Sequence, residues 1–344
     1  MKIARVCWMM ALMLAAALVP DATAQQQSQT ASGQATQRQQ AAGAFQLAPI
    51  PPDIGMRKVD IYSAGTRMSG EVFVSKSAAA GEKLPTIVMA HGWGGVAALL
   101  RPEAVAFAQA GYLVLTFDYR GWGGSDSRVI LTRPAPPNPP NHKFTAEVQE
   151  VREVVDPLDM ADDWLAAINW LAGEPQCDVN RIGLWGSSFS GGLVVWAAEH
   201  DHRVKAIHSQ VGSLDSRTLN GSLKDQELER KQATARARGE LGYPAPLATE
   251  IGQLRGAPIR ERFLNYAPVE DVNKAPDCAM QFIIAEKEEL FDNRLNAIKA
   301  FNDFNGPRKN LITVPGITHY GIYTTARQDA LKFALAWFDT YLKP

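Results

Sequence analysis

The sequence contains few cysteines and carries almost no net charge. Its 344 residues include three cysteines, and 35 Lys and Arg against 36 Asp and Glu give a formal net charge of −1. A balanced charge gives no reason to expect a nucleic acid or an acidic membrane surface as a partner. The sequence also lacks a cluster with metal-ligand spacing and a glycine loop that cradles phosphate, so we expect no metal and no other cofactor.

The amino terminus has the three parts of a secretory signal peptide. Two basic residues precede an apolar run over residues 6–19, and the small-residue triplet Ala22-Thr23-Ala24 follows it. A membrane anchor needs a longer apolar span, so the pattern predicts cleavage after Ala24 and a signal peptide over residues 1–24. We therefore expect a secreted or periplasmic protein with no stable membrane span after cleavage.

Residues 25–48 are rich in Gln, Ala, Ser and Thr and have almost no large apolar side chains. Such a segment cannot bury enough surface to offset the entropy of ordering it, and it predicts a disordered low-complexity tether. Residues 49–344 then form the folded domain. After processing the chain keeps Cys177 and Cys278, and their spacing does not decide between one disulfide and two unpaired thiols.

Apolar strands alternate with helices along the folded domain. We expect strands over residues 58–62, 70–75, 85–90, 112–118, 182–185, 204–211, 280–285 and 311–314. We expect helices over residues 101–110, most of 147–172, 191–199, about 292–302, and a closing helix that ends near residue 342. This alternation predicts an α/β fold with a mostly parallel sheet covered on both faces. In such sheets the functional residues gather at the carboxyl ends of the strands.

Two segments interrupt the alternation. Residues 133–143 carry five prolines and predict an extended surface loop. Residues 213–268 are charged and partly helical, and they follow the carboxyl end of a strand. This insertion is either a small cap over the site or a solvated excursion without a role there.

Residues 186–192 read Gly-Ser-Ser-Phe-Ser-Gly-Gly, between an apolar run and a helical one. A strand, a sharp turn and a helix with serine at the apex require small residues two positions on either side of that serine. Gly186 and Ser190 fill those positions, so Ser188 is the candidate nucleophile. A second register, with Ser190 at the apex, would push the turn into the helix. The alternative to both is a small-residue helix start that only packs on a strand.

A nucleophilic serine needs a base, an orienting acid and donors for the oxyanion. His319 lies just past the last expected strand, and we favour it as the base over the five other histidines. A glycine-rich loop, residues 91–95, follows the strand at 85–90. The backbone amides of Trp93 and Phe189 are the candidate oxyanion donors.

The acid is the least determined member of the site. Three glutamates and an aspartate follow the strand at 280–285, and Glu288 has the best reach, with Glu289 and Asp292 behind it. Asp215, just after the strand at 204–211, is a rival because an acid can reach the same histidine from there. An acidic helix start would also explain the cluster, since carboxylates favour amino-terminal turns.

Five motifs, in this order, give the chain a family resemblance: residues 91–95, 118–125, 186–190, 285–288 and 316–320. From about residue 55 onward the chain resembles the α/β-hydrolase superfamily, near its dienelactone-hydrolase-like and X-Pro-peptidase-like (S15) members. The resemblance implies the α/β-hydrolase fold and the order serine, acid, histidine. Dienelactone hydrolases use cysteine at the apex, so their substrate does not carry over, and Glu288 stands where Asp is commoner.

The resemblance and the residues together imply acyl transfer to water. We expect a carboxylic ester hydrolase that takes a small-molecule ester and forms an acyl-enzyme on Ser188. The alternatives are an X-Pro-type peptidase or amidase, which typically carries additional domains, and a non-catalytic binding protein on the same fold. Trp122 and Tyr320 are candidate substrate-binding residues, although aromatic side chains also stabilise loops. The oligomeric state and the natural substrate stay open.

Overall fold

The computed structural model describes residue 47 and residues 49–217, 223–245 and 254–343. The chain divides into two units, Met1–Gln46 and Leu47–Pro344, and the described residues belong to the second. The expected signal peptide and, apart from Leu47, the expected tether lie outside the described residues.

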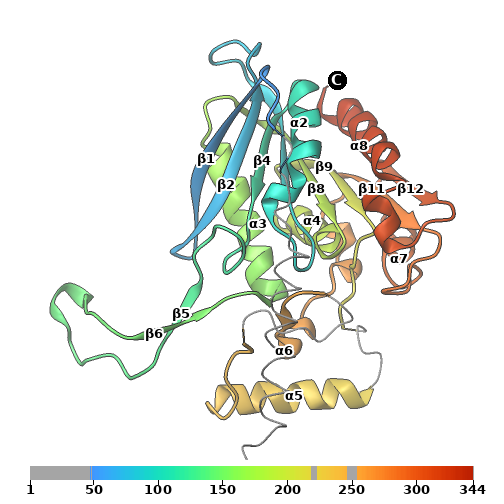
Figure 1. Ribbon diagram of the computed structural model, residues 1–344. Helices are drawn as coiled ribbons and strands as arrows, with labels where there is room; N and C mark the ends of the chain where they lie inside the picture. Colours follow the sequence, from blue (N-terminus) through green and yellow to red (C-terminus); the bar gives the residue numbers. More distant parts are fainter. Residues whose placement is uncertain (1–46, 48, 218–222, 246–253, 344) are drawn as a thin grey trace, which may run out of the picture. The chain divides into compact units, whose positions relative to one another are not determined.

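The centre of the described unit is an eight-stranded sheet with the order β1-β2-β4-β3-β8-β9-β11-β12 (Figure 1). Its strands are β1 (Ile54–Ser63), β2 (Thr66–Ser75), β3 (Leu84–Ala90), β4 (Leu113–Phe117), β8 (Cys177–Ser187), β9 (Val204–Gln210), β11 (Ala279–Ala285) and β12 (Lys309–Val314). Strands β1 and β2 pair antiparallel with each other, and β2 pairs antiparallel with β4. All other neighbours are parallel. The predicted mostly parallel sheet is therefore confirmed.

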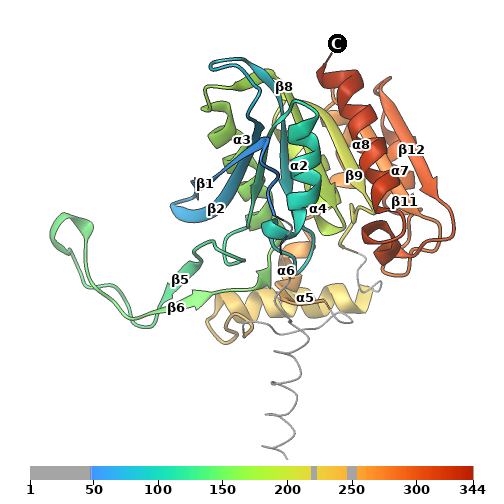
Figure 2. The same cartoon turned by 45° about the horizontal axis from the view of Figure 1, so that its top comes forward.

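Helices cover both faces of this sheet (Figures 1 and 2). The longer ones are α2 (Arg101–Gln109), α3 (Pro157–Ala172), α4 (Phe189–His200), α5 (Leu223–Ala237), α7 (Ala297–Asp303) and α8 (Arg327–Leu342). Alternate residues of β3 separate the faces, as the period of a strand requires. Ile87 and Met89 belong to the buried cluster that includes α2 and α8, whereas Val88 and Ala90 belong to the cluster that includes α3, α4 and α7.

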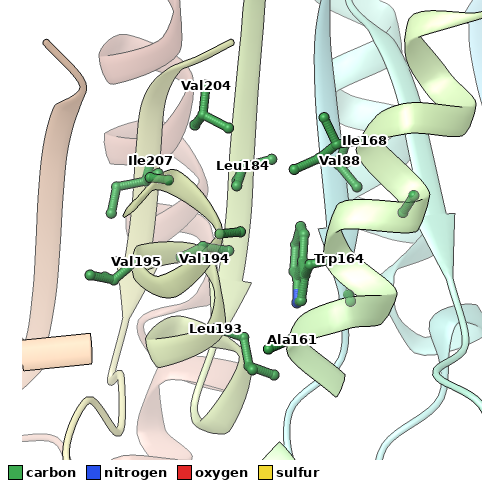
Figure 3. Packing of buried hydrophobic residues seen from close by; sticks show 14 of the residues in the cluster. Val88, Ala161, Trp164, Ile168, Leu184, Leu193, Val194, Val195, Val204 and Ile207 are labelled. Atoms are coloured by element: carbon green, nitrogen blue, oxygen red, sulfur yellow. The ribbon is translucent and has the colours of Figure 1, made fainter. Parts of the chain in front are cut away.

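The larger part of the core lies between the sheet and helices α3 and α4. Figure 3 shows Trp164 of α3 and Leu193 of α4 among the aliphatic side chains of the strands. Trp164 is fully buried, and its Nε1 donates to the Tyr119 hydroxyl at 3.0 Å. This packing fixes α4, the helix that follows Ser188, against β8 and β9.

One expected helix is partly wrong. Residues 147–156 do not extend α3 but form β6 (Val148–Val151) and β7 (Val154–Val155). The helix begins only at Pro157, because the Asp156 carboxylate accepts from the amides of Leu158 and Asp159 and proline is suited to the first helical position. Strand β6 pairs with β5 (Arg128–Leu131), and the Pro-rich loop forms the tip of this hairpin, which extends away from the main sheet (Figures 1 and 2).

The insertion after β9 is more than a charged excursion. It contains α5, β10 (Ala257–Pro258) and α6 (Arg260–Phe263), and α5 is tied to α6 by an ion pair between Arg236 and Glu261. Leu214, Phe263 and Tyr266 are buried core residues. Residues 257–268 therefore contribute to the core, and whether the part around α5 acts as a cap stays a prediction.

Cys177 and Cys278 are both buried and unpaired, which answers the question that their spacing left open. Burial raises the pKa of the Cys278 thiol to about 12. None of the helices in the described part of the chain combines the length and the apolar character that a membrane crossing requires.

Candidate active site

Ser188 occupies a strained turn between β8 and α4. Its φ of 59° and ψ of −126° lie where side chains other than glycine are rarely found. A Cβ atom at Gly186 would lie 2.3 Å from the Ser190 carbonyl oxygen, so only glycine fits there. The Ser188 amide donates to the Gln210 carbonyl of β9 at 2.9 Å. Packing and the neighbouring strand thus hold the turn in its strained form.

The two serines beside Ser188 are bound elsewhere. The Ser190 hydroxyl is buried and lies 3.1 Å from the Tyr119 hydroxyl, with which it shares a hydrogen bond. The Ser187 hydroxyl lies 2.7 Å from the Tyr323 hydroxyl and accepts from Gln210 Nε2 at 3.0 Å. Of the three serines in the turn, only Ser188 presents its hydroxyl to a histidine.

His319 lies between Ser188 and Glu288. Its Nε2 is 2.9 Å from Ser188 Oγ, and its Nδ1 is 2.9 and 3.0 Å from the two carboxylate oxygens of Glu288. The side chains of His319 and Glu288 are 1% and 2% exposed. A buried carboxylate on Nδ1 favours the tautomer with its proton there, which leaves Nε2 free to accept the serine proton.

The other two glutamates of the cluster hold the backbone of the histidine loop. Glu289 accepts from the His319 amide at 2.6 Å, and Glu286 accepts from the Gly316 amide at 2.6 Å. Each of the three glutamates therefore contacts a different atom of residues 316–319. Asp215, the rival from the earlier strand, instead accepts from the backbone amide and the guanidinium of Arg217.

The glycine-rich loop after β3 passes directly against Ser188. A Cβ atom at Gly92 would lie 2.9 Å from Ser188 Cβ and 3.5 Å from Ser188 Oγ. The Trp93 indole anchors the loop, since its Nε1 donates to the Gly256 carbonyl at 3.0 Å and its ring meets that of Phe189 edge-on at 5.7 Å. Among the hydrogen bonds of the described residues, neither the Trp93 amide nor the Phe189 amide is a donor.

The two candidate substrate-binding residues differ in their surroundings. Tyr320 is 48% exposed and its ring meets the His319 ring edge-on at 5.4 Å. Trp122 is only 2% exposed, and its Nε1 donates to the Val154 carbonyl at 3.1 Å. The Trp122 indole is therefore buried in the domain, and its contact with a substrate stays a prediction.

The sequence reasoning missed Tyr323 and Gln210. Tyr323 lies four residues after His319 on the short helix η5 (His319–Tyr323), and its hydroxyl shares a hydrogen bond of 2.7 Å with the Ser187 hydroxyl. Burial raises the pKa of this hydroxyl to about 12. The spacing of four residues between His319 and Tyr323 could have indicated this position, because residues about one turn apart on a short helix lie on the same side of it.

Two family models each match more than half of the chain. The model of the X-Pro dipeptidyl-peptidase (S15) family matches residues 64–241, and that of the prolyl oligopeptidase family matches residues 158–344. The first match contains Ser188, and the second contains Ser188, Glu288 and His319.

Curated relatives match over shorter lengths. An uncharacterized 31.7 kDa protein of Escherichia coli is 35% identical over 147 residues, which are 42% of this chain and 43% of the relative. The quorum-quenching protein AidA of Acinetobacter baumannii is 32% identical over 175 residues, 49% of this chain and 50% of the relative. The thiohydrolase aneE of Aspergillus aculeatus is 27% identical over 57% of this chain and 55% of its own length. The chain thus spans about half the length of the curated relatives it matches.

Solved structures share the fold at low sequence identity. A hypothetical protein from Pseudomonas aeruginosa has a TM-score of 0.67 at 19% identity, covering 87% of this chain and 97% of that one. The α/β-hydrolase GrgF from Penicillium sp. sh18 has a TM-score of 0.65 at 19% identity, covering 84% and 100%. An acetyl xylan esterase from Paenibacillus sp. R4 has a TM-score of 0.57 at 19% identity, covering 86% and 87%.

Proposed function

Since the chain belongs to the α/β-hydrolase superfamily, in the group that the S15 and prolyl oligopeptidase models describe, we propose that it is a serine hydrolase of carboxylic esters. One observation carries this proposal. Ser188, His319 and Glu288 are joined by hydrogen bonds of 2.9 to 3.0 Å in the order that nucleophilic catalysis requires. A binding protein without catalysis would have no need for a strained serine aimed at a buried histidine–carboxylate pair.

The reaction would run in two acyl transfers. Ser188 Oγ bonds to the ester carbonyl carbon while its proton passes to His319 Nε2, and the carbonyl electron pair moves onto the oxygen. The amides of Trp93 and Phe189 would hold this oxyanion, and each such donor contributes about 3–4 kcal/mol in comparable sites. Collapse breaks the bond to the alcohol, which takes the proton from His319. Water then repeats the sequence on the acyl-enzyme and releases the acid.

Glu288 would act through His319 and not on the substrate. Its carboxylate accepts from Nδ1, fixes the orientation of the ring and stabilises the imidazolium that forms when Nε2 takes the serine proton. Because both side chains are almost fully buried, this ionic interaction is weakly screened by solvent.

An ester suits the site better than an X-Pro peptide. A peptidase that measures from the substrate's amino terminus needs a carboxylate to bind the ammonium group. The three glutamates nearest His319 already accept hydrogen bonds from residues 316–319. Among the relatives, one is named a thiohydrolase and another, from Aspergillus calidoustus, an acyltransferase.

The test is a substrate panel. Purified protein should release p-nitrophenol from p-nitrophenyl acetate, butyrate and octanoate, and it should leave X-Pro-nitroanilides untouched at the same concentration. Faster cleavage of the nitroanilides would establish the peptidase instead. No turnover of either series would favour the non-catalytic binding protein.

We also propose that the protein is exported, because residues 1–24 have the composition of a signal peptide. Expression in a Gram-negative host followed by fractionation should place the protein in the periplasm or medium, with a mature chain that starts at Gln25. A cytoplasmic protein that retains Met1 or Lys2 would contradict this proposal.

A further inference from the structure

The glycine-rich loop after β3 contacts the turn of the nucleophile on one side of Trp93 and the insertion on the other. At Gly92, a Cβ atom would lie 2.8 Å from the Ser187 carbonyl oxygen. At Gly94, whose φ is 74°, a Cβ atom would lie 2.8 Å from the Arg255 carbonyl oxygen. Trp93, the residue between the two glycines, carries one of the two candidate oxyanion donors. The loop therefore joins this donor to the insertion.

The insertion holds the Trp93 side chain in two ways. Residues 255–263, which we call the return segment, contain β10 and α6. The Gly256 carbonyl accepts from Trp93 Nε1 at 3.0 Å, and the centre of the Phe263 ring lies 5.8 Å from that of the Trp93 ring. Because β10 pairs in parallel with β7, the return segment is itself fixed to the rest of the domain.

The return segment also contacts the residue that carries the second candidate donor. Phe189 directly follows Ser188, and the centre of its ring lies 5.7 Å from the ring centres of both Trp93 and Phe263. The side chains of Phe189 and Phe263 are buried. Three aromatic rings thus pack together, and two of them belong to the residues whose amides are the candidate oxyanion donors.

The loop itself has little that would fix the direction of the Trp93 amide. Glycine on both sides of Trp93 leaves the peptide many conformations. Within the loop, the Gly92 carbonyl oxygen lies 3.3 Å from the Gly95 amide nitrogen and 2.9 Å from His91 Nδ1, and neither contact involves Trp93. An oxyanion donor is effective only when it is already directed at the developing charge. The support for this donor therefore comes from outside the loop.

We propose that the return segment positions the oxyanion donors, through the indole of Trp93 and the ring of Phe263. This inference rests on the proposed function. Phe263 is a positioning residue, since its ring holds the two residues whose amides would meet the oxyanion. The Trp93 indole has the same role for its own backbone. The insertion therefore sets the rate of acyl transfer, independently of any effect that the part around α5 has on access to the site.

The experiment compares three variants with the wild type. Trp93→Phe keeps an aromatic ring and removes the indole N–H, and Phe263→Leu removes the ring on the side of the insertion. Trp337→Phe is the control for the loss of a buried indole, because Trp337 lies on α8 and packs in the other core cluster. For each protein we would measure kcat and KM on p-nitrophenyl acetate, the inhibition constant of a trifluoromethyl ketone, and the thermal midpoint.

The ketone reports directly on the oxyanion donors. Ser188 Oγ adds to its carbonyl carbon, the serine proton passes to His319, and the carbonyl oxygen becomes the oxyanion of a stable adduct. Such transition-state analogues gain affinity from the same donors that lower the barrier. A loss of positioning should therefore weaken the ketone and lower kcat by similar factors, whereas a loss of stability alone should change neither.

Trp93→Phe should lower kcat by about 10- to 100-fold, somewhat less than the loss of a whole oxyanion donor, with KM within about twofold. Phe263→Leu should lower kcat by about 3- to 10-fold, since it removes aromatic contacts but leaves the hydrogen bond to Gly256 in place. The inhibition constant of the ketone should rise by a similar factor in each variant. Trp337→Phe should lower only the thermal midpoint.

Four results would overturn this inference alone. They are a wild-type kcat in folded Trp93→Phe, a raised KM at unchanged kcat, a lowered kcat at unchanged ketone affinity, and an equal fall in kcat in Trp337→Phe. If Trp93→Phe does not fold, Phe263→Leu decides by the same measurements. A wild-type protein that neither hydrolyses the ester nor forms the ketone adduct on Ser188 would instead overturn the proposed function, and this inference with it.

Discussion

The two halves of the candidate active site are held in place by different forces. Ser188 is fixed by close packing, because Gly186 and Ser190 touch across the turn and α4 is buried in the core. His319 lies on a loop that carboxylates hold, through Glu286, Glu288 and Glu289. Close packing is sensitive to atomic shifts of a few tenths of an ångström. A carboxylate instead holds its partner through its charge and its hydrogen bonds.

This difference predicts how each half fails. A change of volume should damage the serine half, since a close-packed turn has no room to relax. A change of charge at constant volume should damage the histidine half. The predictions below test this division, from the largest expected effect to the smallest.

Removal of the nucleophile should have the largest effect. Ser188→Ala should abolish hydrolysis of p-nitrophenyl acetate, because no other hydroxyl of the turn reaches His319. Ser187→Ala and Ser190→Ala should retain activity. The measurement is the steady-state rate of p-nitrophenyl acetate hydrolysis by each of the three variants. Loss of activity in Ser190→Ala alone, with Ser188→Ala active, would place the nucleophile in the other register.

The orienting acid should come next. Glu288→Gln keeps the volume and removes the charge, and comparable changes in serine triads lower the rate by about 10⁴-fold. Glu289→Gln is the matched change beside it, and it should cost about tenfold or less, since an amide oxygen can still accept from the His319 amide. Equal kcat losses in the two variants would refute this division of roles, and a crippled Asp215→Asn with active Glu288→Gln would move the acid to the earlier strand.

A pair of glycines tests volume. A methyl group at Gly186 meets the Ser190 carbonyl oxygen at 2.3 Å, whereas one at Gly316, in the histidine loop, meets nothing within 4 Å. Gly186→Ala should therefore lower the free energy of unfolding by about 3 kcal/mol or more, and it should also lower kcat. Gly316 has a φ of 75°, so Gly316→Ala should cost about 1–2 kcal/mol and leave the rate nearly unchanged. Urea denaturation and kcat check both, and equal losses would show that packing does not distinguish the halves.

The last prediction concerns the pH dependence of stability and leaves catalysis aside. Glu199 of α4 is 4% exposed, and its carboxylate has no hydrogen-bond partner among the described residues. Burial, and next the charge of Asp271, raises the pKa of Glu199 to about 9, against the opposing charge of Lys274. The folded protein then keeps a proton that the unfolded chain loses above about pH 4.5, so stability should fall as pH rises from about 4.5 to 9.

Glu199→Gln removes this dependence. Its thermal midpoint should decline less than that of the wild type between pH 5 and 9, and the variant should be the more stable protein at pH 9. Parallel midpoint curves would show that Glu199 does not titrate in this way.

The serine half could be predicted from sequence in more detail than the histidine half. The small residues at positions 186 and 190 indicate that the backbone approaches closely across the turn. The sequence therefore predicts which serine lies at the apex. Which carboxylate reaches the histidine depends on how the backbone of residues 286–292 turns. The four acidic residues there and the one after β9 each lie within a few residues of a strand end, so sequence distance does not separate them. Only the structure shows that Glu288 hydrogen bonds with Nδ1 of His319, whereas Glu286 and Glu289 accept from backbone amides.

Contacts between distant segments are not visible in local sequence patterns. The Trp122 indole donates to the Val154 carbonyl, and nothing in its glycine-rich loop indicates that contact. The run before Pro157 was assigned to a helix although its valines favour strands, and its partner, residues 128–131, lies across a Pro-rich loop. Local sequence patterns predicted the strands of the main sheet. The pairing of strands that lie far apart in the sequence became visible only in the structure.

The most direct test of the central claim is the site of covalent modification. The wild-type protein would be treated with a fluorophosphonate, digested, and mapped by tandem mass spectrometry. We predict a single adduct, on Ser188, that forms far more slowly in Glu288→Gln. An adduct on Ser187 or Ser190, or no adduct on an active protein, would contradict the account.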